Sequence, residues 1–424
     1  MVKIDIISKE LIKPSSPTPH HLRTYHLSLL DQLTAILFFP LILYYSNDET
    51  GDHTQSNMSH CLKTSLSNAL TRFYPLAGRI KDERSVDCND EGVDYLEARV
   101  YAKLSDIIEL PEAEVLNQLV PYTKNGSVVI RDVQLGVQVN LLDCGSIAIG
   151  VCISHRIADG HSFVMFINTW AAMARGERDL VHPNLNNASL FPPLDLPKPT
   201  NSSQERVLVT KRFVFNSSAI AALKARAVTG ASCTVQQPTR VEVVTALIWK
   251  CAMAQRDLDR CSTSIAAHQV NLRGRMVTPM AENHFGNLIR TAFATSTDGE
   301  EELASLVHKL REGMKKIDID YIRKLSEDGY AVIKNSSLKK LVERLSGSVQ
   351  LLSFSSWCRF PIYEADFGWG KPTWVSIAGI AIKDTMFLMD SKNGDGIEAW
   401  VVLDEQDMAK FEQHSDLLSY VSSN

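Results

Sequence analysis

A histidine and an aspartate four positions apart stand where one sequence pattern gives way to another. Ser154 to Gly160 reads S-H-R-I-A-D-G, so His155 and Asp159 form an H-x-x-x-D motif. Imidazole, with a pKa near ~6.5, can take a proton from a hydroxyl at neutral pH, which is the task of a general base. Because the chain has twelve histidines, about half a match to this spacing is expected by chance. The alternative is a structural histidine.

The residues before the motif predict a strand, and those after it predict a helix. Residues 147 to 154 alternate large apolar with small side chains, which indicates a strand whose small face lets another element pack closely. Apolar residues then recur at steps of three and four from Phe163 to Ala174, as in a helix with one buried face. We therefore expect His155 at the carboxyl end of a strand.

A second motif lies near the end of the chain. Residues 366 to 370 read D-F-G-W-G, a combination of rare residue types, and Lys371-Pro372 follows. With both motifs the chain resembles the plant BAHD acyltransferase family, whose hallmarks are HxxxD(G) and DFGWG. Family-like stretches follow in order along the whole chain, at 12–19, 30–32, 73–79, 86–90, 271–273 and 394–400. The assortment is most similar to the vinorine-synthase-like acetyltransferases.

The resemblance implies an α/β fold with two similar-sized mixed-sheet domains of the chloramphenicol-acetyltransferase-like type and an active-site channel between them. Residues 183 to 204 are rich in proline and small polar residues, so we expect a crossover without regular structure there. The predicted domains are 1–195, carrying HxxxD, and 209–424, carrying DFGWG, joined by a linker over 196–208. The patterns also predict a strand at 211–215, helices at 303–314 and 338–345, and a hairpin turn at 393–396.

The resemblance also implies roles for residues around the base, His155. Trp357 is expected to donate its indole N–H to the oxyanion of the tetrahedral intermediate, and the alternative is a packed core tryptophan. Asp159 is expected to pair with Arg273 rather than to orient His155 as in a hydrolase triad, with Arg275 as the alternative partner.

Two further groups are expected to support the site without touching the reacting atoms. The resemblance implies a structural role for Asp366, Gly368, Trp369 and Gly370, where the glycines allow tight turns around the tryptophan. Thr239 opens a capping-box pattern, T-R-V-E, at a predicted helix start, which offers free N–H groups to phosphate. The matching segment of the family borders the coenzyme A channel, so the resemblance implies that Thr239 contacts coenzyme A; a plain helix cap is the alternative, and Lys371 is a weaker candidate.

The sequence motifs of hydrolases, dinucleotide-binding enzymes and phosphate-binding loops are absent from the chain. The chain has neither a G-x-S-x-G nucleophile elbow nor a dinucleotide-binding G-x-G-x-x-G. Gly370-Lys371 is not a phosphate-binding loop, because Ala365 replaces its first glycine and Pro372 its hydroxyl residue. His155, Asp159 and His161 offer no fixed metal geometry, and the family uses no metal. We expect no metal and no tightly bound cofactor, with acetyl-CoA as a cosubstrate.

Composition and charge limit the partners and the cellular compartment that we expect for the protein. A net charge of −5 without a clustered Lys/Arg run argues against nucleic acid. The N-terminal residues lack the apolar core of a signal peptide, and the longest apolar run, Leu33 to Tyr45, is broken by Pro40 and shorter than the ~20 residues of a membrane span. That run predicts buried strands. The eight cysteines form no C-x-x-C pair and are expected to be reduced. We expect a cytoplasmic monomer.

The function expected from these observations is acyl transfer from a thioester to an alcohol. The leading hypothesis is direct transfer of acetyl from acetyl-CoA to a hydroxyl of a plant specialised metabolite, with an alkaloid as first choice. Malonyl-CoA or another donor, a terpenoid or volatile alcohol acceptor, and N-acyl transfer on the same scaffold are alternatives. Thioester hydrolysis and a catalytically silent binding protein are the remaining ones.

Overall fold

The computed structural model describes residues 2–47, 55–109, 111–124, 127–128, 132–196, 207–229, 235–254, 263–276, 282–297, 301–334, 349–380 and 382–422. It divides into two compact units. Unit 1 comprises Met1–Pro197, Met280–Leu288 and Phe360–Ala381, and unit 2 comprises Lys198–Pro279, Ile289–Arg359 and Ile382–Asn424. Each unit contains one six-stranded sheet with helices, so the expected mixed α/β class is confirmed.

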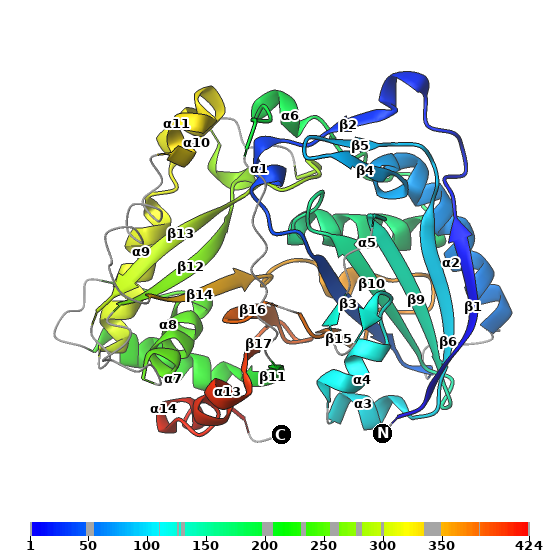
Figure 1. Cartoon of the computed structure of the whole chain (residues 1–424). Helices are drawn as coiled ribbons and strands as arrows, with labels where there is room; N and C mark the ends of the chain where they lie inside the picture. The colour runs from blue at the N-terminus through cyan, green and yellow to red at the C-terminus, as the bar shows by residue number, and fades with distance from the viewer. Residues whose placement is uncertain are drawn as a thin grey trace. The chain divides into compact units, whose positions relative to one another are not determined.

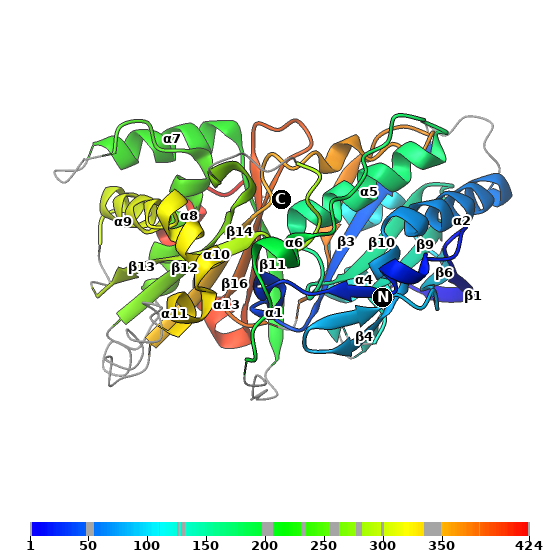
Figure 2. The ribbon, with the colours of Figure 1, turned by 90° about the horizontal axis from the view of Figure 1, so that it is seen from above.

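Unit 1 is built on a mixed sheet with the order β1-β6-β9-β10-β3-β15. Its strands are β1 (Ile4–Ile12), β3 (Phe38–Tyr45), β6 (Val93–Val100), β9 (Leu135–Leu142), β10 (Ile147–Ser154) and β15 (Trp374–Ile377). Helices α2 (Gln55–Arg72) and α5 (Gly160–Ala174) lie side by side on one face of this sheet (Figures 1 and 2). The apolar run at 33–45 yields β3, whose eight residues are all buried, as predicted.

Shorter elements complete unit 1. They are β2 (Thr24–His26), β4 (Arg79–Asp82), β5 (Ser85–Asp87), β7 (Thr123–Lys124), β8 (Ser127–Val128), α1 (Leu29–Gln32), α3 (Leu104–Glu109), α4 (Ala113–Gln118) and α6 (Asn187–Leu190), with 3-10 turns at His20–Leu22, Tyr74–Ala77 and Ile362–Glu364. Helix α6 corrects the expectation that 183–204 lacks regular structure. Asn187 donates its side-chain N–H to the carbonyl oxygen of Phe285 at 2.7 Å, a tertiary contact that composition does not reveal.

Unit 2 is built on a second mixed sheet with the order β11-β17-β16-β14-β12-β13. Its strands are β11 (Leu208–Phe215), β12 (Thr263–Asn271), β13 (Ile289–Ser296), β14 (Val349–Ser356), β16 (Thr385–Asp390) and β17 (Ile397–Asp404). Its helices are α7 (Ser217–Val228), α8 (Arg240–Met253), α9 (Leu303–Lys315), α10 (Ile319–Glu327), α11 (Gly329–Lys334), α13 (Glu405–Phe411) and α14 (Ser415–Leu418), with a 3-10 turn at Arg273–Arg275. Buried residues of α7, α8 and α9 form one core with the sheet.

Most predicted elements of unit 2 are present. The strand at 211–215 lies within β11, the helix at 303–314 is α9, and the hairpin turn at 393–396 joins β16 to β17 with Gly394 at φ +72°. The helix predicted at 338–345 and most of the linker at 196–208 lie outside the described residues.

The division into units differs from the continuous domains predicted at 1–195 and 209–424. Strand β15 pairs antiparallel with β3, which brings residues 360–381 from the C-terminal half of the sequence into unit 1. The DFGWG motif, expected in the C-terminal domain, therefore lies in the same unit as His155. The order of residues in the sequence does not reveal that residues 360–381 join unit 1, because pairing between strands depends on a tertiary contact.

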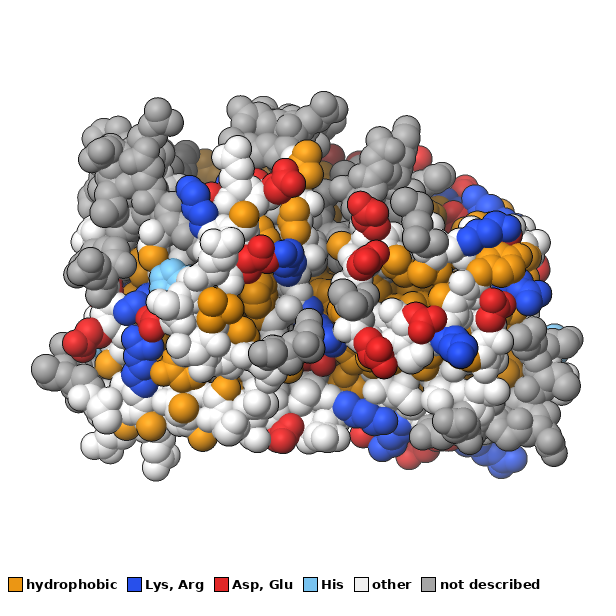
Figure 3. Space-filling view, turned by 90° about the horizontal axis from the view of Figure 1, so that it is seen from below, with side chains coloured by type: hydrophobic (Ala, Val, Ile, Leu, Met, Phe, Trp, Pro, Cys, Tyr) orange, Lys and Arg blue, Asp and Glu red, His pale blue; other side chains and the backbone are white. Residues whose placement is uncertain are grey.

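Three general features concern the described residues as a whole. None of their helices is long and apolar enough to cross a membrane. The six described cysteines, at positions 61, 88, 144, 152, 251 and 358, are free thiols. On the face seen in Figure 3, acidic and basic side chains are interspersed among the residues drawn in colour.

Candidate active site

His155 lies in the turn between β10 and α5, as the sequence predicts (Figure 1). The turn ends at Asp159, which has extended backbone and caps α5 by accepting the N–H of Ser162 at 2.8 Å. A capped helix start fixes the backbone between strand and helix, because it satisfies an N–H group that the helix itself leaves free. The side chain of His155 is partly buried.

The small face of β10 packs closely, as the alternation predicted. A Cβ atom on Gly150 would lie 2.1 Å from the carbonyl oxygen of Leu119, so only glycine fits there. The side chain of Asn140 on β9 donates to the same carbonyl oxygen at 2.8 Å and to that of Ala148 at 3.0 Å. These contacts hold the strand that carries His155.

The ring of His155 is held in one orientation. Its Nδ1 atom is 3.0 Å from the carbonyl oxygen of Ala158, and because a carbonyl only accepts, Nδ1 carries the hydrogen. The neutral ring then has its lone pair on Nε2. The edge of the ring meets Phe39 at 4.6 Å between centroids. Burial lowers the pKa of His155 below its ordinary value, and the Ala158 carbonyl and the charge of Asp159 oppose that effect.

Asp159 makes backbone contacts. Besides the cap to Ser162, its Oδ2 atom accepts the N–H of Leu288 at 3.0 Å, and the residue is 2 % exposed. The acceptor at Nδ1 of His155 is the carbonyl of Ala158, so the ring is oriented by backbone rather than by the carboxylate of a triad.

The backbone of His155 is held on both sides. Its N–H donates to Leu37 O at 2.8 Å, and its carbonyl oxygen accepts from Thr34 Oγ1 at 3.1 Å and from Asn287 Nδ2 at 2.8 Å. Asn287 also contacts Asp31, which caps α1 together with Ser28. Sequence reasoning gave Asp31 and Asn287 no role. The S-x-x-D capping pattern at Ser28 could have indicated Asp31, but no local signal marks Asn287.

The DFGWG motif forms a tight turn. Asp366 Oδ1 accepts the N–H groups of Gly368 at 2.8 Å and Gly370 at 3.0 Å, and both glycines have positive φ, +108° and +99°. Trp369 is 4 % exposed and stacks on Phe367 at 5.7 Å between ring centroids.

The same motif is attached to the sheet and helix that flank His155. Tyr45 of β3 donates its hydroxyl to the carbonyl oxygen of Ala365 at 2.7 Å, and Arg175, which follows α5, donates to the carbonyl oxygen of Asp366. Phe367 meets Trp170 of α5 at 4.8 Å between centroids. The motif thus braces α5 and β3. Lys371 is paired with Glu364 at 2.6 Å.

The other predicted site residues belong to unit 2. Arg273 is 1 % exposed, and its Nη1 atom is 3.3 Å from Asn271 Oδ1. Arg275 donates Nη1 to the carbonyl oxygens of Met314 at 2.8 Å and Ile317 at 3.0 Å. These contacts give Arg275 a role at the end of α9, whereas the pairing of Arg273 with Asp159 stays a prediction.

Thr239 and Trp357 have defined local roles. Thr239 caps α8 in the predicted capping box: its hydroxyl accepts the N–H of Glu242 at 3.2 Å, and Glu242 accepts the N–H of Thr239 at 2.8 Å. Glu242 also binds Arg311 at 2.6 Å. Trp357 follows β14, is 3 % exposed and donates its backbone N–H to Leu388 O at 2.7 Å. Contact of Thr239 with coenzyme A and oxyanion stabilisation by Trp357 stay predictions.

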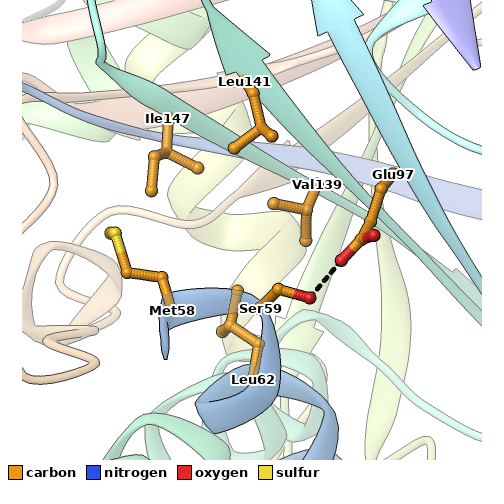
Figure 4. Close-up of a pocket in the computed structure, with 7 residues that line it drawn as sticks. All are labelled: Met58, Ser59, Leu62, Glu97, Val139, Leu141 and Ile147. Carbon is orange, nitrogen blue, oxygen red and sulfur yellow. Dashed lines mark hydrogen bonds between the residues drawn. The ribbon is translucent and has the colours of Figure 1, made fainter. Parts of the chain in front are cut away.

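A cavity of about 260 Å³ in unit 1 is a separate feature (Figure 4). Its lining residues come from α2, β6, β9 and β10: Met58, Ser59, Leu62, Glu97, Val139, Leu141 and Ile147. Ser59 donates its hydroxyl to Glu97, whose carboxylate also contacts Ser8 and Lys63. Ile147 begins β10 whereas His155 follows its end, so at ~3.3 Å per residue the two lie roughly 26 Å apart. The cavity is therefore remote from His155.

Clusters of possible metal ligands are absent from the described part of the chain. No group of three or more His, Cys, Asp or Glu residues there is arranged to hold an ion.

Comparison with known proteins gives consistent matches over the whole chain. The sequence profile of the Transferase family matches residues 2–418. Stemmadenine O-acetyltransferase of Catharanthus roseus is 39% identical over 430 residues, which cover 100% of this chain and 99% of that protein. Limonoid 1-O-acetyltransferase of Citrus sinensis is 39% identical over 445 residues, covering 99% of each.

A solved structure matches as well. Vinorine synthase of Rauvolfia serpentina is 39% identical over 434 residues, which cover 100% of this chain and 99% of that protein. The crystal structure of vinorine synthase superposes with a TM-score of 0.87 at 38% identity, covering 100% of this chain and 99% of that chain.

Proposed function

The chain belongs to the Transferase family, that is, to the BAHD acyltransferases, and from this premise we propose that it transfers acetyl from acetyl-CoA to a hydroxyl of a polycyclic plant metabolite. An alkaloid is the first choice of acceptor. BAHD acyltransferases use acyl-CoA thioesters and small-molecule acceptors, so the proposal adds the donor, the acceptor class and the residues.

The observation that carries the proposal is the state of His155. Its Nδ1–H donates to the carbonyl of Ala158, which leaves the lone pair of the neutral ring on Nε2, and burial lowers the pKa of the ring below its ordinary value. A base in this form can take the hydroxyl proton of an alcohol without first losing one of its own.

The reaction then proceeds in two balanced steps. Nε2 of His155 takes the hydroxyl proton while the alcohol oxygen forms a bond to the thioester carbonyl carbon, which gives a tetrahedral oxyanion. The oxyanion collapses, the carbon–sulfur bond breaks, and the departing thiolate takes the proton back from Nε2. Trp357 is proposed to donate its indole N–H to the oxyanion, a contribution worth about 10²–10³ in rate when one such donor is lost.

The other predicted residues are proposed to act indirectly. Asp159 caps α5 and holds the turn that contains His155. Its proposed pairing with Arg273 would set a negative charge beside the guanidinium of Arg273, which is only 1 % exposed. Thr239 is proposed to contact coenzyme A from the start of α8. Its hydroxyl accepts the N–H of Glu242 at this helix start, and the N–H groups of a helix start favour a phosphate oxygen.

The acceptor class rests on the relatives. Stemmadenine O-acetyltransferase and vinorine synthase support an alkaloid. A limonoid, and so a terpenoid alcohol, is the second candidate, because limonoid O-acetyltransferases match at similar identity. Both classes present a hydroxyl on a bulky, largely apolar skeleton, which a cavity lined by apolar side chains binds well.

One assay tests the reaction and the acceptor together. The enzyme is incubated with acetyl-CoA alone and with a panel of alkaloid alcohols, limonoid alcohols, volatile alcohols and amines, and free thiol is followed with product mass. Thiol release that requires an alcohol supports O-acyl transfer; release without an acceptor indicates hydrolysis, and release only with amines indicates N-acyl transfer. His155→Ala is the control for background release. Competition among acetyl-, malonyl-, benzoyl- and hydroxycinnamoyl-CoA decides the donor, and preference for another donor would overturn the acetyl assignment.

A further inference from the structure

The cavity of about 260 Å³ in unit 1 has an apolar wall and one charged end (Figure 4). Its floor is a continuous stretch of the sheet. Glu97 of β6 pairs in register with Val139 of β9, and Leu141 of β9 pairs with Ile147 of β10. The N-terminal half of α2 covers these side chains. An apolar cavity of about 150 Å³ binds benzene, so this one has room for roughly ten non-hydrogen atoms.

The apolar wall is buried and suits a hydrocarbon group. Met58 and Leu62 stand four positions apart on α2, so they share one face of the helix. That face is turned toward Val139 and Ile147 in Figure 4. Each of these four side chains is at most 4 % exposed. Because none of them carries a strong hydrogen-bonding group, this part of the cavity favours an apolar group over water.

The charged end is the carboxylate of Glu97. Its Oε1 atom accepts the hydroxyl of Ser59 and lies 3.2 Å from Lys63 Nζ, and its Oε2 atom accepts the hydroxyl of Ser8 at 2.9 Å. A carboxylate has about four lone-pair positions, so these three donors of the described chain leave room at Oε2 for one more. Both hydroxyl hydrogens are used by the carboxylate. This end of the cavity therefore offers acceptors, and a ligand must bring the donor.

The charges around Glu97 favour a cationic donor. Lys63 Nζ contacts two carboxylates, Glu97 at 3.2 Å and Glu10 at 2.7 Å, so negative charge is in excess. Arg99, the next residue of β6 on the same face, is paired with Asp143 at 3.3 Å. Burial opposes the ionisation of Glu97, but the hydroxyls that it accepts and Lys63 lower its pKa below the ordinary value. The ionised carboxylate attracts an ammonium group more strongly than a neutral hydroxyl.

We propose that this cavity is a second ligand site, which binds a compact apolar compound that carries one primary ammonium group. The apolar part fills the space between α2 and the sheet, and the ammonium group donates to Oε2 of Glu97. The side chain of Glu97 is 15 % exposed, so the ammonium group lies at the rim and keeps part of its hydration, which reduces the cost of binding. The site is remote from His155 and independent of the proposed acetyl transfer.

Binding of phenethylamine to the whole enzyme is the primary test, followed by ligand-observed NMR titration at neutral pH. We expect a dissociation constant of about 1 mM, as for a good ligand of this size. Phenethyl alcohol, which has the same shape with a neutral donor, should bind about fivefold more weakly or worse, and phenylacetate should show no saturable binding. Equal affinity of the alcohol would overturn the ammonium assignment, and no binding of the amine at about 10 mM would overturn the site.

Two substitutions of equal charge test the contact with Glu97. Glu97→Gln keeps the shape of the side chain and removes its charge, so it should weaken binding of the amine about tenfold or more. Glu10→Gln is the matched control, because Glu10 contacts the same Lys63 from outside the described lining of the cavity. Its effect should stay below about threefold. Equal effects of the two substitutions would mean that the amine responds only to the general charge, which would overturn the contact.

A substitution that fills the cavity tests where the amine binds. Val139→Phe should abolish binding, and Leu141→Phe, at a partly exposed position of the same wall, replaces it if that variant does not fold. A ligand that binds only the folded state raises Tm, so about 10 mM amine should raise it by about 3 °C in the unsubstituted enzyme and not in the filled variant. Undiminished binding in the filled variant would place the amine elsewhere and overturn the proposal. Absence of acetyl transfer would refute the proposed function alone, since these measurements do not depend on it.

Discussion

Replacing Asp366 should destabilise unit 1 through the loss of two defined hydrogen bonds. Its Oδ1 atom accepts the N–H of Gly368 at 2.8 Å and that of Gly370 at 3.0 Å. Gly368 is exposed, so water can replace its partner, whereas Gly370 is partly buried. With about 0.5–1 kcal/mol for the first bond and about 1.5 kcal/mol for the second, Asp366→Ala should lower the free energy of unfolding by about 2 kcal/mol. For a domain of roughly 150–250 residues this corresponds to about 4–8 °C in Tm.

Asp366→Asn is the matched comparison, because both bonds end on Oδ1 and an amide oxygen can accept them. We expect this variant to lose only about 0.5–1 kcal/mol, the difference between charged and neutral acceptors. Thermal unfolding followed by tryptophan fluorescence suits the purpose, since Trp170 and Trp369 both contact Phe367 next to the substituted residue. Equal losses of Tm in the two variants, or no loss in Asp366→Ala, would refute the assignment of the motif as a hydrogen-bonded brace.

Four further predictions concern His155, the proposed base, and the residues around it. His155→Ala should lower kcat by about 10²-fold or more with little change in coenzyme A affinity, measured by steady-state kinetics and titration calorimetry; more than a tenth of the original kcat would contradict the base. Because burial lowers the pKa of His155, kcat/KM should decline at low pH with a midpoint below the ordinary histidine value of about 6.5, whereas a midpoint above about 7 would exclude this assignment. Burial lowers the pKa of His268 as well, so both rings bind protons more readily in the unfolded chain than in the folded one. The urea concentration at the midpoint of unfolding should therefore decrease as the pH is lowered from about 7.5 to about 5.5; a midpoint that stays constant would count against buried neutral rings. Asp159→Ala and Arg273→Ala should each impair stability, with the double variant less impaired than the sum, because one unpaired buried charge is worse than none; strict additivity in a double-mutant cycle would mean that the two residues do not meet.

Local patterns predicted the elements that carry the site. The alternation before His155 gave β10 and its small face, because the period of side chains along a strand follows from backbone geometry alone. The T-R-V-E pattern predicted the cap of α8, because the hydrogen bonds of a capping box join residues only three positions apart. By contrast, the helix α6 in a proline-containing stretch depends on a bond from Asn187 to Phe285, and no local pattern indicates it.

The sequence by itself determined the family of the protein and the place of His155 at the end of a strand. The intact H-x-x-x-D and D-F-G-W-G motifs, with shorter stretches in order, are properties of residue identity and order, and the family match over residues 2–418 agrees with them. Only the tertiary structure placed the DFGWG motif in the unit of His155, through the pairing of β15 with β3. It alone brought Asn287 to the backbone of His155. Such contacts join residues far apart in the chain, and they form because buried polar groups and sheet edges must find partners wherever the fold provides them.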